Sequence, residues 1–482
     1  MQKTNVKANT VFNTIKSIFG IIYPLITFPY ISRVLMAENV GKVNFGSSIV
    51  SYFSLIASLG VTTYAVRECS KIRDDKEKLG ETASQILSIN MVSTLVAYVA
   101  LAVTLIVAKP LESYRTLICI QSTTILFTSL GADWLNTAME DFQFIAIRTT
   151  GMQIISLILL FVYVRKSEDY IVYAMVSVVA ASGANIINIF YRRKFCKIKL
   201  TLHMNIKKHL PPILLLFTMV FSQIIYTNSD TTMLGIIRGD FEVGLYSTAV
   251  KMYQLVNTVI ASVAWVVMPQ LSAGFAGHDY KIVNRLLKYS LNFIIILGLP
   301  CITGVNVISK QIISIIAGKQ YLGAATALHI LTCTLFFSLI GGWIGNMTML
   351  PAGREKVCLF SCSMSAVVNI ILNFVLIPYF GVNAAASTTA VAECVGVIVM
   401  SRFFDKNIKI DNLTEMMKAP LVGCVGIILV SFFAKVIFTS DLFIALFTIS
   451  GSIIVYGLAL LALKNEFALG FLQPMINKMK RG

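Results

Sequence analysis

The chain has 482 residues, of which 56% are hydrophobic and only 13% are charged, and its mean hydropathy is +0.78. A soluble globular protein carries roughly 25% charged residues, so this composition excludes a mainly water-exposed fold. The net charge of +17 does not indicate nucleic-acid binding, because the basic residues lie in short connectors between apolar segments rather than on one basic face.

Apolar segments of about twenty residues recur along the chain, which is the helical length that crosses a hydrocarbon core about 30 Å thick. No segment shows the alternating pattern of a lipid-facing strand. We therefore predict an all-α, polytopic membrane protein with about fourteen transmembrane helices. In chain order the predicted spans are residues 11–34, 43–66, 85–108, 115–138, 149–164, 170–190, 211–236, 243–268, 289–308, 324–347, 357–377, 382–403, 419–438 and 442–463.

The connectors between the spans predict the orientation. Most of the 40 Lys and Arg residues fall in the alternate connectors that share a side with the amino terminus, including Arg148 between spans four and five. Lys and Arg resist translocation, so both termini are expected in the cytoplasm. The longest connector, around residues 192–210, has only about twenty residues, so we expect no soluble catalytic domain and no enzyme activity.

Metal, cofactor and targeting signals are not found. The nine cysteines are scattered without a Cys-x-x-Cys pair, and the four histidines have no ligand spacing, so neither disulfides nor a metal site is expected. No cofactor motif and no ATP-binding P-loop is present. The first apolar stretch is long and lacks a small-residue cleavage site, so we expect no cleavable signal peptide.

The two halves of the sequence resemble each other. The segment Glu38–Gly41 opens the second span and Glu242–Gly244 opens the eighth, so that the two glycines lie 203 residues apart. With six spans on each side of the basic connector, this similarity favours two parallel repeats around a central site. We predict an amino-terminal lobe at 1–200, a carboxy-terminal lobe at 201–410, and two extra helices with a basic tail at 411–482.

Charged residues inside the spans are the first site candidates, because each costs roughly 2.5 to 3.5 kcal/mol on insertion scales. Lys16 lies in the first span, where it can either snorkel to the interface or line a cavity. Arg33 ends the same span and is either an interfacial anchor or a cavity residue. Asp133 lies near the cytoplasmic end of span four, where it is either a solvated helix end or a site residue.

Two further charges lie at matching depths in spans seven and eight. Asp230 lies about 9 Å and Lys251 about 12 Å from the same face at 1.5 Å per residue. They can form a structural pair, act as a gate or binding site, or point in unrelated directions. Glu393 lies in the middle of span twelve, where we expect either a neutral, hydrogen-bonded carboxyl or a proton-coupling group.

Three stretches resemble the oligosaccharide and polysaccharide flippases of the multidrug/oligosaccharidyl-lipid/polysaccharide exporter superfamily. They are Tyr23–Leu35 with Gly41–Phe45, Ala57–Gly60 leading to Tyr64–Glu68, and Asn228–Gly235 with Val243–Ser247. This resemblance implies two six-helix lobes facing a central cavity, plus two carboxy-terminal helices that open a groove for a lipid tail. It also implies a multi-pass protein of the bacterial cytoplasmic membrane.

The resemblance implies a flippase that carries an undecaprenyl-pyrophosphate-linked oligosaccharide of O-antigen, capsule or exopolysaccharide to the outer leaflet by alternating access. Lys16, Arg33 and Lys251 would then be charge-assisted donors to the pyrophosphate. Polar residues in central spans would contact sugar or simply join helices, and these are Gln121, Gln223, Asn228, Tyr253, Gln254 and Trp265.

Expected partners are the lipid-linked oligosaccharide, membrane lipids, a coupling ion that is either H⁺ or Na⁺, and other polysaccharide-assembly proteins. One alternative is a cation-coupled multidrug antiporter of the same superfamily, which would favour an acidic or aromatic cavity. A second alternative is a membrane-embedded glycan polymerase or glycosyltransferase, which would normally carry a larger loop outside the membrane.

Overall fold

The computed structural model describes residues 6–465, 467, 469 and 470, and all regular structure in this part of the chain is helical. The all-α prediction is therefore confirmed. Backbone contacts divide the chain into two compact units, Met1–Gly244 and Leu245–Gly482. The predicted lobe limits at residues 200 and 410 remain predictions.

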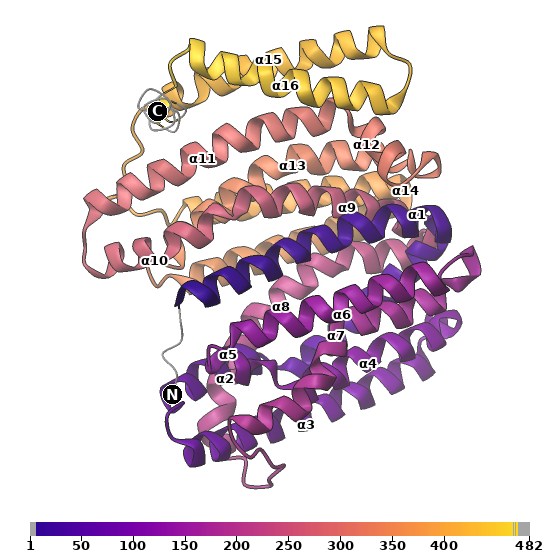
Figure 1. Cartoon of the computed structure of the whole chain (residues 1–482), viewed down its shortest axis with the longest axis vertical. Helices are drawn as coiled ribbons and strands as arrows, with labels where there is room; N and C mark the ends of the chain where they lie inside the picture. Colours follow the sequence, from indigo (N-terminus) through magenta and orange to yellow (C-terminus); the bar gives the residue numbers. More distant parts are fainter. Residues whose placement is uncertain (1–5, 466, 468, 471–482) are drawn as a thin grey trace. The chain divides into compact units, whose positions relative to one another are not determined.

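The first unit contains eight helices and the start of a ninth (Figure 1). They are α1 (Val6–Ser58), α2 (Val61–Lys71), α3 (Lys76–Val107), α4 (Arg115–Gly131), α5 (Asp133–Ala138), α6 (Phe142–Tyr163), α7 (Tyr170–Tyr191), α8 (Ile206–Ile237) and α9 (Asp240–Ala261). The helix α1 packs against α3, α4, α6 and α8, while α7 packs against α4 and α6. Asp75 begins α3 by accepting hydrogen bonds from the backbone N–H groups of Glu77 and Lys78, an N-cap that its sequence position favours.

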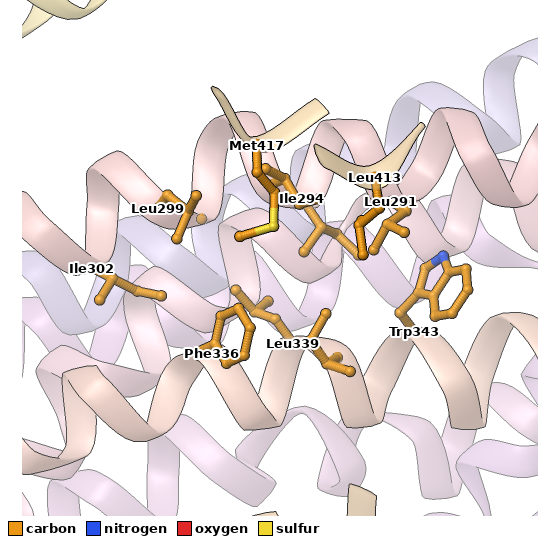
Figure 2. A pocket seen from close by; sticks show the side chains of 12 residues that line it. Leu291, Ile294, Leu299, Ile302, Phe336, Leu339, Trp343, Leu413 and Met417 are labelled. Atoms are coloured by element: carbon orange, nitrogen blue, oxygen red, sulfur yellow. The ribbon is translucent and has the colours of Figure 1, made fainter. Parts of the chain in front are cut away.

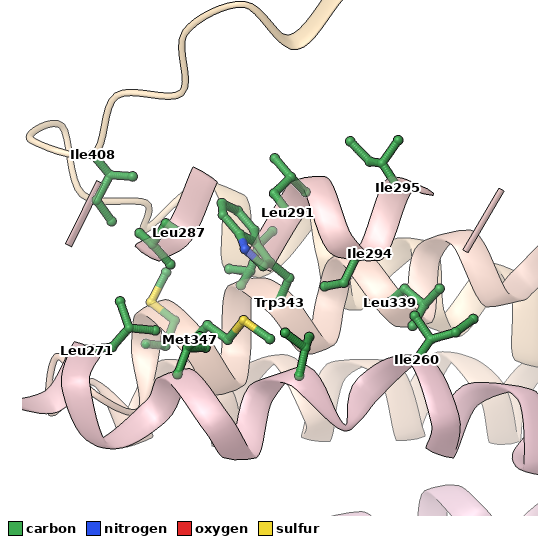
Figure 3. Packing of buried hydrophobic residues seen from close by; sticks show 14 of the residues in the cluster. Ile260, Leu271, Leu287, Leu291, Ile294, Ile295, Leu339, Trp343, Met347 and Ile408 are labelled. Atoms are coloured by element: carbon green, nitrogen blue, oxygen red, sulfur yellow. The ribbon is translucent and has the colours of Figure 1, made fainter. Parts of the chain in front are cut away.

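The second unit contains the remainder of α9 and the helices that follow. They are α10 (Val263–Ala276), α11 (Tyr280–Val307), α12 (Ser309–Ile316), α13 (Ala324–Ile344), a π-helical turn at Gly345–Met349, α14 (Glu355–Ser401), α15 (Leu413–Ile437) and α16 (Asp441–Ala462). The helix α11 packs against α13 and α15, and α15 packs along α16. Figure 3 shows the apolar core of this unit, in which Leu287, Leu291, Trp343 and Met347 lie together.

The helices are long and apolar enough for a multi-pass membrane protein. Among the described residues, ten helical segments meet the length and hydropathy expected of a membrane span. Two of them, α1 and α14, each carry two predicted spans, joined at Met36 (φ 64°) and at Gly381 (φ 53°). Predicted spans four and eight begin on α4, which has only 17 residues, and on α9, and neither helix is among the ten.

Large apolar side chains cover the outside of these helices. Ile106, Phe374 and Val436 are 70 to 75% exposed, far more than a water-facing surface would tolerate in quantity. Hydrocarbon does not penalise apolar surface as water does, so these side chains are suited to contact lipid.

The turn before the second span recurs 203 residues later. Met36 has φ 64°, and Gly239, which precedes the eighth predicted span, has φ 90°. Glycine adopts a positive φ without steric cost, whereas Met36 adopts it against the preference of a residue with a side chain. A residue with positive φ therefore occurs at the same place in the two similar segments.

The two similar segments also contact each other reciprocally. A Cβ added to Gly41 would lie 1.8 Å from the backbone oxygen of Asp240, and one added to Gly244 would lie 2.0 Å from the backbone oxygen of Ala37. Asp240 follows Ala37 by the same 203 residues that separate the glycines. This reciprocity is the signature of local two-fold symmetry, and it explains why both positions are glycine.

Candidate functional site

The first unit contains an ion pair whose arginine is buried. Arg148, on α6, has a side chain that is 2% exposed, and its guanidinium forms an ion pair with Asp133 of α5. Its Nη1 also donates a hydrogen bond of 2.8 Å to the backbone oxygen of Ala184 on α7. The sequence placed Arg148 in the connector between spans four and five, but the helix α6 already starts at Phe142 and carries this side chain inward.

Lys16 lies near this ion pair. Its side chain, on α1, is partly buried and lies within electrostatic reach of Arg148. Lys16, Arg148 and Asp133 thus bring two cations and one carboxylate together from α1, α6 and α5. Asp133 is 43% exposed, yet it has a specific partner rather than water alone. Such a group of cations in an apolar protein can attract an anion.

Asp230 is buried on α8, at 4% exposure, within electrostatic reach of Tyr52 in the second half of α1. The hydroxyl of Tyr52 lies 3.1 Å from Oγ1 of Thr232, which donates a 3.0 Å hydrogen bond to Oγ of Ser48. The carboxylate therefore belongs to a polar cluster between α1 and α8. Lys251 is partly buried and lies in the second unit, so its pairing with Asp230 stays a prediction.

Glu393, on α14, is partly buried and lies within electrostatic reach of Tyr253 on α9 and of Cys362 on α14. Tyr253 forms a side-chain hydrogen bond with Ser338 of α13. Glu393 therefore lies near a hydroxyl of α9 that is itself hydrogen-bonded to α13. Both roles proposed for this residue, a neutral hydrogen-bonded carboxyl and a proton-coupling group, stay predictions.

The remaining charged and amide candidates are mostly exposed. Arg33, Gln223 and Gln254 all have exposed side chains, on α1, α8 and α9. Asn228 is partly buried, and its Nδ2 donates a 3.0 Å hydrogen bond to the backbone oxygen of Ile224 on its own helix. Contact of these four residues with a substrate stays a prediction.

Two further polar candidates give different outcomes. Gln121 is buried on α4 and donates a 2.9 Å hydrogen bond to the backbone oxygen of Val43, so it joins α4 to α1. The side chain of Trp265 lies outside the described part of the structure.

A buried polar cluster on α14 was missed by the sequence analysis. Asn369, Asn373 and Thr388 are all 0% exposed. Asn373 Nδ2 donates a 3.0 Å hydrogen bond to Oδ1 of Asn369 and Asn373 Oδ1 accepts one from Thr388 Oγ1. Two asparagines four residues apart in an apolar span were the available signal, because that spacing places both on one helix face.

The second unit also contains an apolar cavity of about 210 Å³ between α11, α13 and α15 (Figure 2). Its lining residues are all apolar: Leu291, Ile294, Ile295, Gly298, Leu299, Ile302, Phe336, Leu339, Ile340, Trp343, Leu413 and Met417. The indole N–H of Trp343 is occupied by a 3.1 Å hydrogen bond to Ser290, so it does not add polarity to the cavity. An apolar cavity of roughly 150 Å³ already excludes water and binds benzene, so this larger one suits hydrocarbon.

A metal centre finds no support among the described residues, which include no group of three or more His, Cys, Asp or Glu side chains able to hold a metal ion.

Comparisons with known proteins agree with this architecture. A family model described as "Polysaccharide biosynthesis protein" matches residues 6–275. A relative from Shigella dysenteriae, named as an O-antigen transporter, is 23% identical over 79% of this chain and 95% of its own length. A relative from Escherichia coli K12 with the same name is 21% identical over 84% of this chain and 98% of its own length.

Among solved structures, the chain is similar to the lipid II flippase MurJ in an inward closed conformation. The TM-score is 0.76 at 20% sequence identity, covering 97% of this chain and 100% of that one. The similarity shows that the two proteins share a fold. The named relatives and this structural neighbour are transporters or flippases, not enzymes.

Proposed function

The chain belongs to the family of polysaccharide biosynthesis proteins, and from this we propose that it is a flippase for lipid-linked oligosaccharides. The cargo we propose is an undecaprenyl-pyrophosphate-linked repeat unit of O-antigen, capsule or exopolysaccharide. It would move from the cytoplasmic to the outer leaflet of the bacterial cytoplasmic membrane by alternating access, with both protein termini in the cytoplasm.

The observation that carries the proposal is the apolar cavity between α11, α13 and α15. The chain also matches nearly the whole length of two relatives that are named as O-antigen transporters. A polyprenyl chain is hydrocarbon and needs an apolar path. All twelve lining residues are apolar, and α15 is one of the two helices that follow the predicted twelve-span arrangement. A drug exporter that accepts compact lipophilic cations would not need such a cavity for a long tail.

The pyrophosphate requires cations inside an apolar protein. Lys16, beside the Arg148–Asp133 ion pair, supplies a positive charge on α1, and Arg33 and Lys251 are the other candidates. Charge-assisted hydrogen bonds to phosphate oxygens are roughly twice as strong as neutral ones, which compensates for removing the pyrophosphate from water.

A coupling ion, H⁺ or Na⁺, would act through a buried carboxylate. Asp230 and Glu393 are the two candidates, because each is a carboxylate on an apolar helix, Asp230 near the hydroxyl of Tyr52 and Glu393 near that of Tyr253. Other polysaccharide-assembly proteins are proposed partners in delivering and consuming the cargo.

The test is a clean deletion in a strain with no second flippase, complemented by the wild-type chain. We expect surface polysaccharide to be lost while lipid-linked repeat units accumulate on the inner leaflet. Normal surface glycan would refute the proposal. Accumulated units on the outer leaflet would indicate a polymerase instead, and altered drug tolerance with normal glycan would indicate an antiporter.

A further inference from the structure

A basic pocket lies in the first unit where α3 begins and α7 ends. Its volume is about 560 Å³. Five cations line it together with two carboxylates: Lys76, Arg193, Lys194, Lys197 and Lys199 with Glu77 and Glu81. The pocket therefore carries a net positive charge, and Gly80, Ser84, Phe195 and Cys196 complete its wall.

Much of this positive charge is uncompensated by the protein. Within the described part of the chain, no carboxylate lies within salt-bridge distance of Lys76, Lys197 or Lys199. By contrast, the nearby Lys71 and Lys78 are paired with Glu68 and Asp75. The pocket thus attracts an anion from outside the chain.

The connector after α7 follows α3 toward the membrane. The backbone N–H of Lys199 donates a 3.0 Å hydrogen bond to Ser84 Oγ, and that of Thr201 donates one of 2.9 Å to Ser88 Oγ. Ser88 lies one turn farther along α3 than Ser84, about 6 Å at 1.5 Å per residue. Residues 199 to 201 therefore descend along a helix that crosses the membrane.

The length of α3 places this connector at the edge of the hydrocarbon. Its 32 residues extend about 48 Å, while the hydrocarbon core is about 30 Å thick. If the apolar end at Val107 marks the far boundary, the excess of about 18 Å, or about twelve residues, lies at the near end. The near boundary then falls at Ser88, and the pocket around Lys76 to Ser84 lies at the level of the lipid headgroups.

Two leucines of the connector support this placement. Leu200 is 67% exposed and Leu202 is 92% exposed, although both are large apolar residues in a segment otherwise rich in lysine. Water would make these exposures unfavourable, whereas acyl chains beside Ser88 would not. Apolar side chains and lysines that alternate at an interface are typical of a membrane-docking segment.

We propose that this pocket binds the headgroup phosphate of an anionic phospholipid, such as phosphatidylglycerol, with the acyl chains against Leu200 and Leu202. The bound lipid holds the connector between the two predicted lobes at the membrane surface. The inference depends on the membrane-spanning role of α3 and not on the proposed flippase activity.

The first experiment measures lipid binding by native mass spectrometry of the purified full chain, titrated with phosphatidylglycerol and with phosphatidylcholine. We compare the triple variant Lys76→Gln, Lys197→Gln, Lys199→Gln with a control triple, Lys281→Gln, Arg285→Gln, Lys356→Gln. The control residues are exposed and do not line the pocket, and their substitution removes the same three positive charges. Each cation near an anionic lipid surface contributes a factor of roughly five in affinity, so removal of three should weaken binding of phosphatidylglycerol about a hundredfold.

The control triple should retain wild-type binding, and phosphatidylcholine should bind weakly to all three proteins. Equal binding of the two lipids by the wild type, or equal losses in both triples, would overturn the proposal. Displacement of the lipid by an equal concentration of soluble glycerol phosphate would also overturn it, since the pocket would then be a site for a free anion.

The second experiment tests the depth of the connector without removing any cation. Leu202→Trp adds a fluorophore at an exposed position, and the protein is placed in bilayers of brominated phosphatidylglycerol. After subtraction of the wild-type signal, we expect strong quenching by lipids brominated near the glycerol end of the acyl chain. An added fluorophore quenched only by a water-soluble agent would refute the membrane position of the connector.

Discussion

The reciprocal contact of Gly41 and Gly244 leads to a prediction whose sign can be worked out from the structure. A Cβ at position 41 would lie 1.8 Å from the backbone oxygen of Asp240, whereas ordinary contacts of Cβ atoms begin at 3.4 Å. The two backbones must therefore separate by about 1.6 Å, because neither atom belongs to a flexible side chain. Overpacking of this kind costs about 1 to 3 kcal/mol, and occasionally more.

Alanine also favours a helix over glycine by about 1 kcal/mol, which offsets part of that cost. With an overpacking cost near the upper end of that range, about 3 kcal/mol, and a helix gain of about 1 kcal/mol, we expect Gly41→Ala to lower the free energy of unfolding by about 2 kcal/mol. Gly151→Ala on α6 is the matched control, because nothing lies within 4 Å of its added Cβ. That variant should gain stability, by about 1 kcal/mol at most.

The assay is denaturant or thermal unfolding of the purified variants in one detergent. Because Gly41→Ala already separates the two segments, adding Gly244→Ala should cost less than Gly244→Ala alone. If Gly41→Ala and Gly151→Ala shifted stability in the same direction, or if the two glycine substitutions were additive, the reciprocal contact would be refuted.

Four other predictions follow from single contacts. Asp133→Asn leaves the buried Arg148 guanidinium without its ion-pair partner and should lower the free energy of unfolding by about 3 to 5 kcal/mol. As a control, Glu415→Gln breaks an exposed pair with Lys418 and should lower it by less than about 1 kcal/mol. Equal losses in the two variants would contradict a stabilising role for the Asp133–Arg148 pair. Leu299→Trp fills the apolar cavity and should reduce glycan export at normal protein abundance, while Leu297→Trp, exposed on the same helix, should not; equal export by both would remove the cavity from the transport path. If Asp230 and Lys251 form a structural pair, reversing both charges should restore the abundance and export that Asp230→Asn and Lys251→Gln lose. If Lys251 instead contacts pyrophosphate, the reversal should restore abundance without export. Full activity of both single variants would exclude the pair from the site. Burial raises the pKa of Asp240 above its ordinary value, although the hydrogen bond from Tyr114 lowers it in part. A carboxyl whose pKa is raised by folding contributes stability that is fully present below the unfolded pKa and is lost as pH rises, so Asp240→Asn should be more stable than wild type at pH 7 and lose that advantage in acid. A stability difference that stayed constant across pH would contradict this prediction.

Local sequence determined the fold class and the positions of the helices. Apolar stretches of about twenty residues must be helical in lipid, because only a helix satisfies every backbone group within one segment. All of the predicted spans accordingly fall on helices, including the two pairs joined within α1 and α14. The 203-residue offset between Gly41 and Gly244 also appears in the sequence, as a short repeated motif.

Only the tertiary structure decided what the polar residues contact. Arg148 looked like a connector residue by position, yet α6 buries its side chain, which pairs with Asp133. For Gln121 the sequence left two roles open, contact with sugar or a bond between helices, and in the structure it joins α4 to α1. The position of a residue in a predicted span specifies its depth in the membrane. Its contact partner depends on which helices pack beside it and on how each helix is rotated about its axis.

The same reason applies to the sites that the sequence did not indicate. The apolar cavity consists of residues that look like ordinary lipid-facing positions on three separate helices, and their arrangement around one space depends on how α11, α13 and α15 pack. The pocket around Lys197 and Lys199 looked like a run of topogenic charge, and only the hydrogen bonds to Ser84 and Ser88 place that run against α3. Hydropathy and charge are properties of short segments, so the sequence shows them directly. Cavities and ion pairs form between segments that are distant in sequence, so only the packed structure shows them.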